Sequence, residues 1–150
     1  MSNTKLKGNL LFESKSTADT KDRVKRVESH GQIKLKWDAD ILVLNASGPF
    51  NYEGIMDALH QIQSSVEAAK LNSWKRLTIL DTESLGSIEV VDVMKQNHIW
   101  VMEHGCTATA IVVRSIFQAE IFDEIAKVGN LSQKTFTDEQ EAKNWLQSQP

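Results

Sequence analysis

Short runs in which apolar residues dominate or alternate with polar ones begin after residue 30. In 32–37, Ile33, Leu35 and Trp37 alternate with polar residues, the pattern of a strand with one buried face. Residues 41–46 are almost all apolar, as in a strand covered on both faces. A polar turn separates these two runs and predicts a hairpin. Three further strands are predicted at 76–80, 107–113 and 134–136.

Segments with the period of an α-helix separate these strands. Helices are predicted to begin after Asn51, Ser87 and Ser115, whose side chains can accept a hydrogen bond from a free amide of the first turn. Thr137 and Gln140 form a capping box that predicts a last helix. The positions expected to be buried are Ile55, Leu59, Ile62 and Val66, then Val91, Met94, His98, Val101 and Met102, then Ile116, Phe117, Ile121, Phe122 and Ile125, and finally Ala142, Trp145 and Leu146.

The element order ββαβαβαβα predicts one α/β domain over residues 31–150. Strands that alternate with helices are joined by right-handed crossovers and form a parallel sheet. The first strand of the hairpin must then run antiparallel beside it. We therefore expect a three-layer sandwich with a five-stranded mixed, mainly parallel sheet, preceded by a polar, weakly basic extension at 1–30.

Composition limits the class of protein. The chain has 150 residues, of which 41% are hydrophobic and 25% are charged, as in one globular domain. The single cysteine, Cys106, excludes an internal disulfide framework and a cysteine-rich zinc module. No segment resembles a signal peptide, and none approaches the roughly 20 apolar residues that cross a bilayer. The expected location is the cytoplasm.

The charge is unevenly distributed. Residues 1–30 carry a net charge of +3 and residues 31–150 a net charge of −6. Because nucleic-acid affinity rests on clustered positive charge, the acidic body argues against a nucleic-acid partner. The basic stretch at 21–26 is either a solvated tail or a contact to an anionic surface.

Several weak motifs occur in a recognisable order. Gly48-Pro49-Phe50-Asn51 and Gly54 follow the second strand, and Leu80-Asp81 ends the third. Phe136-Thr137-Asp138-Glu139 precedes a helix that contains Ala142, Trp145 and Leu146. Over about residues 30–147 the chain resembles uncharacterised bacterial proteins of the SpoIIAA-like group, whose fold is shared by STAS domains and lipid-carrying CRAL-TRIO domains.

The resemblance implies a regulatory or carrier role. Classical anti-sigma-factor antagonists of this kind carry a phosphorylatable serine in an Asp-Ser-Ser-Gly turn before the helix that follows strand three. Here the corresponding segment, residues 81–87, reads Asp-Thr-Glu-Ser-Leu-Gly-Ser, so the motif is missing. The lipid carriers imply another role, in which an apolar ligand lies beneath a movable helix.

Polar residues gather where the predicted parallel strands end. In open α/β sheets, ligands bind outside these carboxyl ends, where the winding direction changes, and helix N-termini there favour an anion. Arg114 can pair with a carboxylate or phosphate. Alternatively, Arg114 pairs with Asp81 or Glu83, and the neighbouring residues only cap helices. The candidate ligand-binding residues are Ser47, Asn51, Asp81, Ser84, Arg114 and Ser115.

Other reactive side chains are weaker candidates. Ser87 is the expected position of any phosphorylation, although a plain helix cap explains it too. His98 is expected to be a hydrogen-bonded core histidine. Cys106 follows His104 closely, but no basic cluster accompanies it, which favours an inert thiol. Isolated glycines and the lack of a His-x-x-x-His pair predict neither cofactor nor metal, and no catalytic residue is assigned.

Large flexible side chains on the predicted helices suggest one more site. Met94, Met102, Phe117 and Phe122 either line an adaptable apolar pocket or belong to an ordinary core.

Three functions follow from these observations. The first is a non-enzymatic binding or regulatory module that meets a protein partner or small ligand at the carboxyl ends of the strands. The alternative is a carrier or sensor of an apolar, fatty-acid-like ligand, with peripheral membrane contact through the second and third helices. An enzyme using Cys106 or His104 is the third. An open edge strand also permits an oligomer.

Overall fold

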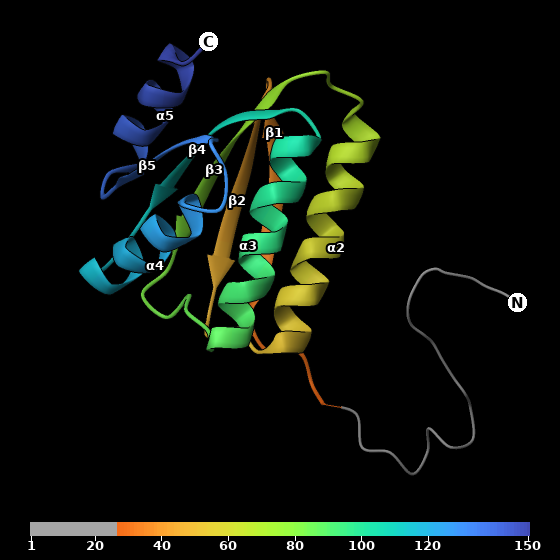
Figure 1. Cartoon of the computed structure of the whole chain (residues 1–150), viewed down its shortest axis with the longest axis vertical. Helices are drawn as coiled ribbons and strands as arrows, with labels where there is room; N and C mark the ends of the chain where they lie inside the picture. Colours follow the sequence, from red (N-terminus) through yellow and green to blue (C-terminus); the bar gives the residue numbers. More distant parts are fainter. Residues whose placement is uncertain (1–26) are drawn as a thin grey trace, which may run out of the picture.

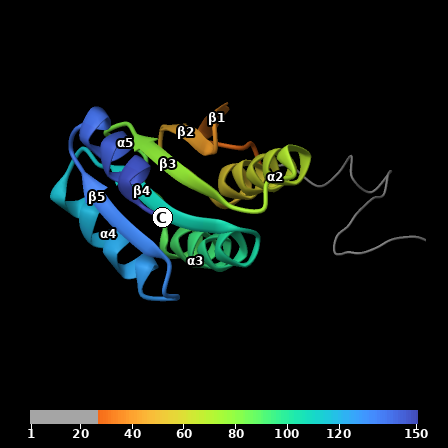
Figure 2. The same ribbon diagram turned by 90° about the horizontal axis from the view of Figure 1, so that it is seen from above.

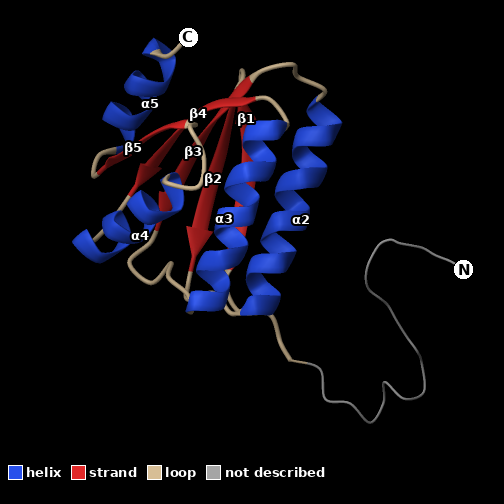
Figure 3. Ribbon diagram, viewed as in Figure 1, coloured by secondary structure: helices blue, strands red, loops and turns tan. Residues whose placement is uncertain are grey.

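The computed structural model describes residues 27–150, so most of the predicted extension at 1–30 lies outside the described part. Residues 27–30 are exposed and form neither helix nor strand. Figures 1 and 3 show the arrangement of the elements that follow. They are β1 (Gln32–Asp38), β2 (Ile41–Ser47), α2 (Tyr52–Ala69), β3 (Trp74–Leu80), α3 (Ile88–Glu103), β4 (Cys106–Val112), α4 (Ile116–Ala126), β5 (Ser132–Phe136) and α5 (Glu139–Ser148).

The five strands form one mixed sheet in the order β1-β2-β3-β4-β5. β1 pairs antiparallel with β2, and all other neighbours are parallel. In Figure 2, α2, α3 and α4 lie on one side of the sheet and α5 lies on the other. The predicted element order and three-layer α/β architecture are confirmed, with β3 and β5 each beginning two residues before the predicted start.

Most helix starts match the sequence signals. Asn51, Ser87 and Ser115 are the N-caps of α2, α3 and α4, and each side chain accepts a hydrogen bond from an amide three residues later. The predicted cap of α5 at Thr137 is wrong. Asp138 caps that helix by accepting a hydrogen bond from the Glu141 amide, and its carboxylate is also favourable at a helix N-terminus.

The sheet separates two apolar cores. The larger core lies beneath α2, α3 and α4 and includes Trp74, which is 1% exposed. The smaller core lies beneath α5, where β4 contributes Ala108 and Ala110 and the helix contributes Ala142 and Leu146. These small side chains allow the helix to approach the strands closely. Strands β3 and β4 are therefore covered on both faces.

The predicted burial of Ile116 and Phe117 is wrong, since these side chains are 78% and 61% exposed. Of the expected positions on α4, Ile125 is buried and Phe122 is half-buried. The buried stripe of this helix starts at Gln118, which is fully buried. Ile116 and Phe117 precede that stripe in the first turn and point away from the core.

Replacing Leu146 by alanine should destabilise the protein by about 2–5 kcal/mol, because it leaves a cavity beneath α5. Leu146 is 0% exposed, whereas the next residue, Gln147, is exposed. Denaturant unfolding of Leu146→Ala and of the control Gln147→Ala measures the difference. Equal stability of both variants would show that α5 is not part of the cooperative core.

Candidate functional site

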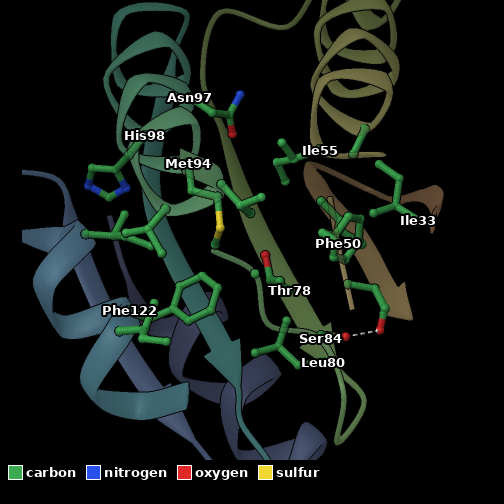
Figure 4. A pocket seen from close by; sticks show the side chains of 18 of the residues that line it. Ile33, Phe50, Ile55, Thr78, Leu80, Ser84, Met94, Asn97, His98 and Phe122 are labelled. Atoms are coloured by element: carbon green, nitrogen blue, oxygen red, sulfur yellow. Dashed lines mark hydrogen bonds between the residues drawn. The ribbon is translucent and has the colours of Figure 1, made fainter. Parts of the chain in front are cut away.

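The side chains of Asp81 and Ser84 stabilise the turn after β3 by hydrogen bonds to each other and to nearby backbone groups. The Asp81 carboxylate accepts from the backbone amides of Gly48, at 3.0 Å, and Glu83, at 3.0 Å. The Ser84 hydroxyl lies 2.6 Å from this carboxylate and 2.8 Å from the Ala46 carbonyl, as Figure 4 shows in part. The hydrogen bond from Ser84 and the backbone amides hold the pKa of Asp81 below its ordinary value. Asp81 and Ser84 thus join the ends of β2 and β3.

A buried glutamine links the ends of β3 and β4. The Gln118 amide group donates to the Asp81 carbonyl at 2.8 Å, and its oxygen accepts from the Arg114 backbone amide at 2.6 Å. The Arg114 side chain donates through Nε to the Leu80 carbonyl at 3.1 Å. Among the described residues, Arg114 forms no ion pair with Asp81 or Glu83.

Asn51 joins α2 to the segment before β1. Its side-chain oxygen accepts from the amides of Gly54, at 2.8 Å, and His30, at 2.9 Å, while its amide nitrogen donates to the Glu28 carbonyl at 2.7 Å. Ser47 and Ser87 are exposed, and Ser87 caps α3. The six predicted ligand-binding residues therefore share one edge of the sheet, where most of their polar groups form internal hydrogen bonds. Ligand binding by them stays a prediction.

The order of the strands and the placement of the helices decide whether a ligand crevice forms at this edge. A ligand crevice at the carboxyl ends of strands arises where the strand order reverses and successive helices diverge to opposite faces. Here the strands follow chain order without reversal, and α2, α3 and α4 all cover the same face. Successive helices do diverge after β4 and β5, since α4 and α5 cover opposite faces. An open hollow of about 640 Å³ lies at that point, and Arg114 and Ser115 are among its lining residues.

A separate cavity of about 90 Å³ lies inside the larger core, between the sheet and helices α2, α3 and α4. Figure 4 shows Met94 and Phe122 reaching into it from α3 and α4. Two of the four predicted pocket residues thus line a cavity. The other two do not: Phe117 is exposed, and Met102 packs over Gly129. Most of the lining is apolar, including Ile55, Ala58, Leu59 and Leu80.

One region of the cavity lining is polar and carries a charge. Arg76, in the middle of β3, is 9% exposed. Its Nε donates to the Thr109 hydroxyl at 3.3 Å and its Nη1 to the Asn97 side-chain oxygen at 2.9 Å. Burial lowers the pKa of Arg76. The sequence patterns did not point to this cluster, although the strand period of two places Arg76 on the same face as Trp74 and Leu80.

His98 lies beside this cluster and is 1% exposed. Its predicted burial is confirmed, but the expected hydrogen bond is not formed: neither ring nitrogen has a partner among the described residues. The Asn97 Nδ2 also lacks a partner there. Burial, and then the positive charge of Arg76, lower the pKa of His98 from 6.5 to about 4.

The remaining reactive side chains are engaged elsewhere. Cys106 is 4% exposed, and burial raises the pKa of its thiol. The His104 ring stacks on Trp100 and its Nδ1 lies 2.7 Å from the Trp100 carbonyl. Within residues 27–150, no three His, Cys, Asp or Glu side chains group as metal ligands. None of the described helices combines the length and the apolar character needed to cross a membrane.

The unpartnered His98 should make stability depend on pH. Between pH 6.5 and about 4 the unfolded chain binds a proton at this residue that the folded protein excludes. Stability is therefore expected to fall by roughly 1–3 kcal/mol as the pH is lowered through this window. Denaturant unfolding at several pH values should show a smaller slope for His98→Gln than for the wild type. The control His60→Gln, at an exposed position of α2, should keep the wild-type slope, and an unchanged slope in His98→Gln would contradict the assignment.

Comparison with known proteins supports the architecture. No protein-family model and no curated protein sequence matches the chain. Among solved structures, it resembles an uncharacterised protein of the DUF3478 family with a SpoIIAA-like fold from Shewanella loihica PV-4. The two share 18% identity with a TM-score of 0.55, and the match covers 82% of this chain and 98% of the other.

A second solved structure has a described role. The unphosphorylated form of the anti-sigma factor antagonist SpoIIAA matches with 13% identity and a TM-score of 0.53, covering 78% of this chain and 99% of the other. At such low identities these matches establish the fold alone. The chain therefore has a SpoIIAA-like fold of the kind found in STAS domains.

Proposed function

We propose that this protein is a non-enzymatic regulatory module that binds a small apolar ligand in the cavity between the sheet and helices α2, α3 and α4. The observation that carries the proposal is the cavity itself, which lies within an otherwise packed core. Protein interiors normally contain few voids larger than a water molecule, because unfilled space forfeits contacts. A ligand would replace those contacts.

The size of the cavity restricts the ligand. Its volume is about 90 Å³, whereas an engineered apolar cavity of about 150 Å³ holds benzene. A short hydrocarbon group is therefore expected, and a longer one would have to displace flexible side chains such as Met94. A full lipid would require larger movements of α3.

The elements around the cavity support a regulatory role. The lining residues come from β1, β2, β3, β5 and three helices, so a ligand would touch elements that are distant in the sequence. Phe50 and Gly86 line the cavity and are half-buried; a β-bridge joins them at the carboxyl edge of the sheet. Binding could therefore alter this edge. The likeness to an anti-sigma factor antagonist, which is a regulatory protein, agrees with such a role.

Filling the cavity should abolish binding. Ala58 lines the cavity and is 2% exposed, whereas Ala68 is exposed on the same helix. With 1-hexanol as the probe, NMR spectra of the ¹⁵N-labelled protein should show shifted amide signals for Thr78, Met94 and Asn97. Ala58→Leu should lose these shifts, and the matched control Ala68→Leu should keep them.

Two outcomes would contradict the proposal. Wild-type spectra that do not change with 1-hexanol would show that the cavity takes no apolar ligand. Shifts that persist in a folded Ala58→Leu variant would place the binding elsewhere. Native mass spectrometry of freshly purified protein, compared with the denatured mass, would reveal a ligand that already occupies the cavity and must first be extracted.

A second candidate function is contact with a protein partner. Ile88 begins α3, and Ile116 and Phe117 begin α4; these side chains are 82%, 78% and 61% exposed. Large exposed apolar residues that recur at one edge favour an interaction surface. Ser87 caps α3 beside Ile88, so a phosphate there would add negative charge to this surface.

This candidate predicts contact at α4 in cells. A photo-cross-linking amino acid at position 116 or 117 should trap one defined protein, whereas the same amino acid at Ser64, an exposed position of α2, should not. Adding Ile88→Ser should weaken the cross-link at 117, because it removes apolar surface from the interface. Equal cross-linking at all positions, or none at 116 and 117, would contradict a specific partner surface.

A further inference from the structure

Arg76 has an unusual environment for a charged residue. It lies midway along β3, and its register neighbours are Leu42 on β2 and Thr109 on β4. The ion pairs formed within residues 27–150 are Lys127–Glu124 and Lys143–Asp38. Arg76 thus has no carboxylate partner in the described part of the chain. Buried guanidinium groups are normally paired, because an isolated charge is poorly solvated inside a protein.

The polar groups around Arg76 leave donors without acceptors. A guanidinium has five N–H groups, and the described residues accept from Arg76 only at Nε and Nη1. The Asn97 Nδ2, another donor, is buried and has no hydrogen-bond partner within residues 27–150. The side chains of Arg76 and Asn97 both line the cavity. Within the described residues, Arg76 and Asn97 therefore face the cavity with unpaired donors and an unbalanced positive charge. One carboxylate would supply both the acceptors and the negative charge.

The rest of the lining defines the other end of the ligand. From Arg76, the cavity follows β3 past Thr78 to Leu80, a span of about 13 Å at the usual rise of a strand. Met94 and Phe122 face this stretch from α3 and α4 (Figure 4). A ligand with one anionic group and one short apolar tail matches both regions.

We propose that Arg76 and Asn97 recognise the carboxylate of a short-chain monocarboxylic acid, whose hydrocarbon tail lies along β3 toward Leu80. This inference rests on the proposed function, since it assigns the chemical class of the ligand of the same cavity. A planar guanidinium binds a carboxylate through two parallel hydrogen bonds. A neutral molecule of the same length would leave the charge of Arg76 unpaired.

Isothermal titration calorimetry at constant ionic strength tests the inference with three probes: sodium hexanoate, 1-hexanol and sodium acetate. Hexanoate is expected to bind about tenfold more tightly than 1-hexanol, which lacks the charge, since hydrogen bonds to charged groups are the stronger ones. It should also bind more tightly than acetate, which lacks the tail. The full chain is used throughout.

Two arginine variants localise the carboxylate. Arg76→Met replaces the charge by an apolar side chain of similar length and should lower the affinity for hexanoate about tenfold or more, with little effect on 1-hexanol. Replacement of a buried charge by an apolar residue is often tolerated by the fold. Arg114→Met removes the exposed arginine at the end of β4 and should leave hexanoate binding unchanged.

The outcomes separate this inference from the proposed function. If hexanoate and 1-hexanol bind wild type equally well, the cavity takes apolar ligands but the carboxylate assignment is wrong. If none of the probes binds, the proposed function is wrong as well. Loss of hexanoate binding in Arg114→Met, but not in Arg76→Met, would move the anion site to the carboxyl edge. Acetate binding as tightly as hexanoate would indicate a site for small anions only.

A measurement on the wild type covers the case in which Arg76→Met does not fold. In ¹⁵N-labelled protein, hexanoate should shift the Nε–H signal of Arg76 and leave that of Arg114 in place, whereas 1-hexanol should shift neither strongly. The Nε–H signal of Arg114 is identified by its absence from the spectrum of Arg114→Met. An Arg76 signal that does not respond to saturating hexanoate would overturn the inference.

Discussion

The coverage of β3 and β4 on both faces is the constraint on which the rest of this structure depends. A strand enclosed in this way must find partners inside the protein for every side chain, because neither face meets water. On the face toward α5, the small side chains of Ala108 and Ala110 in β4 let the helix pack closely against the strand. On the other face, larger residues such as Trp74 fill the space beneath α2 and α3.

Arg76 is the exception within this enclosed layer. Thr109 and Asn97 accept two of its hydrogen bonds, but no carboxylate of the described chain balances its charge. His98 lies beside it, and neither of its ring nitrogens has a partner within residues 27–150. Burial, and then the positive charge of Arg76, lower the pKa of His98. A polar network of this kind costs stability when only partly satisfied. The cavity and the incomplete network occupy the same part of the core, and the proposed carboxylate ligand would account for both.

At the carboxyl edge of the sheet, in contrast to the surroundings of Arg76, most buried polar side chains have hydrogen-bond partners. The side chains of Asp81 and Ser84 hydrogen-bond to each other, and Gln118 hydrogen-bonds to the backbone of Asp81 and Arg114. Such closed networks rigidify the loops that carry them. The exposed apolar residues at the starts of α3 and α4 lie at this same edge. Internal ligand and external partner would then act on adjoining parts of the molecule, connected through the bridge between Phe50 and Gly86.

The sequence by itself determined the element order, the sheet class and most helix starts. These features depend on local signals: the period of apolar residues and the caps at Asn51, Ser87 and Ser115. Local signals also place His98 in the core and Met94 and Phe122 on the inner helix faces. They misplaced Ile116 and Phe117, because the orientation of α4 depends on the burial of Gln118.

The tertiary structure alone decided the character of the candidate site. Alternation along β3 could have indicated that Arg76 points inward, but not that it would lack a carboxylate partner, which depends on residues from α3 and β4 meeting it in space. The cavity likewise depends on how four strands and three helices pack, and no single segment encodes that volume. Periodicity reports which face of an element is buried, whereas charge compensation and empty space are properties of the assembled core.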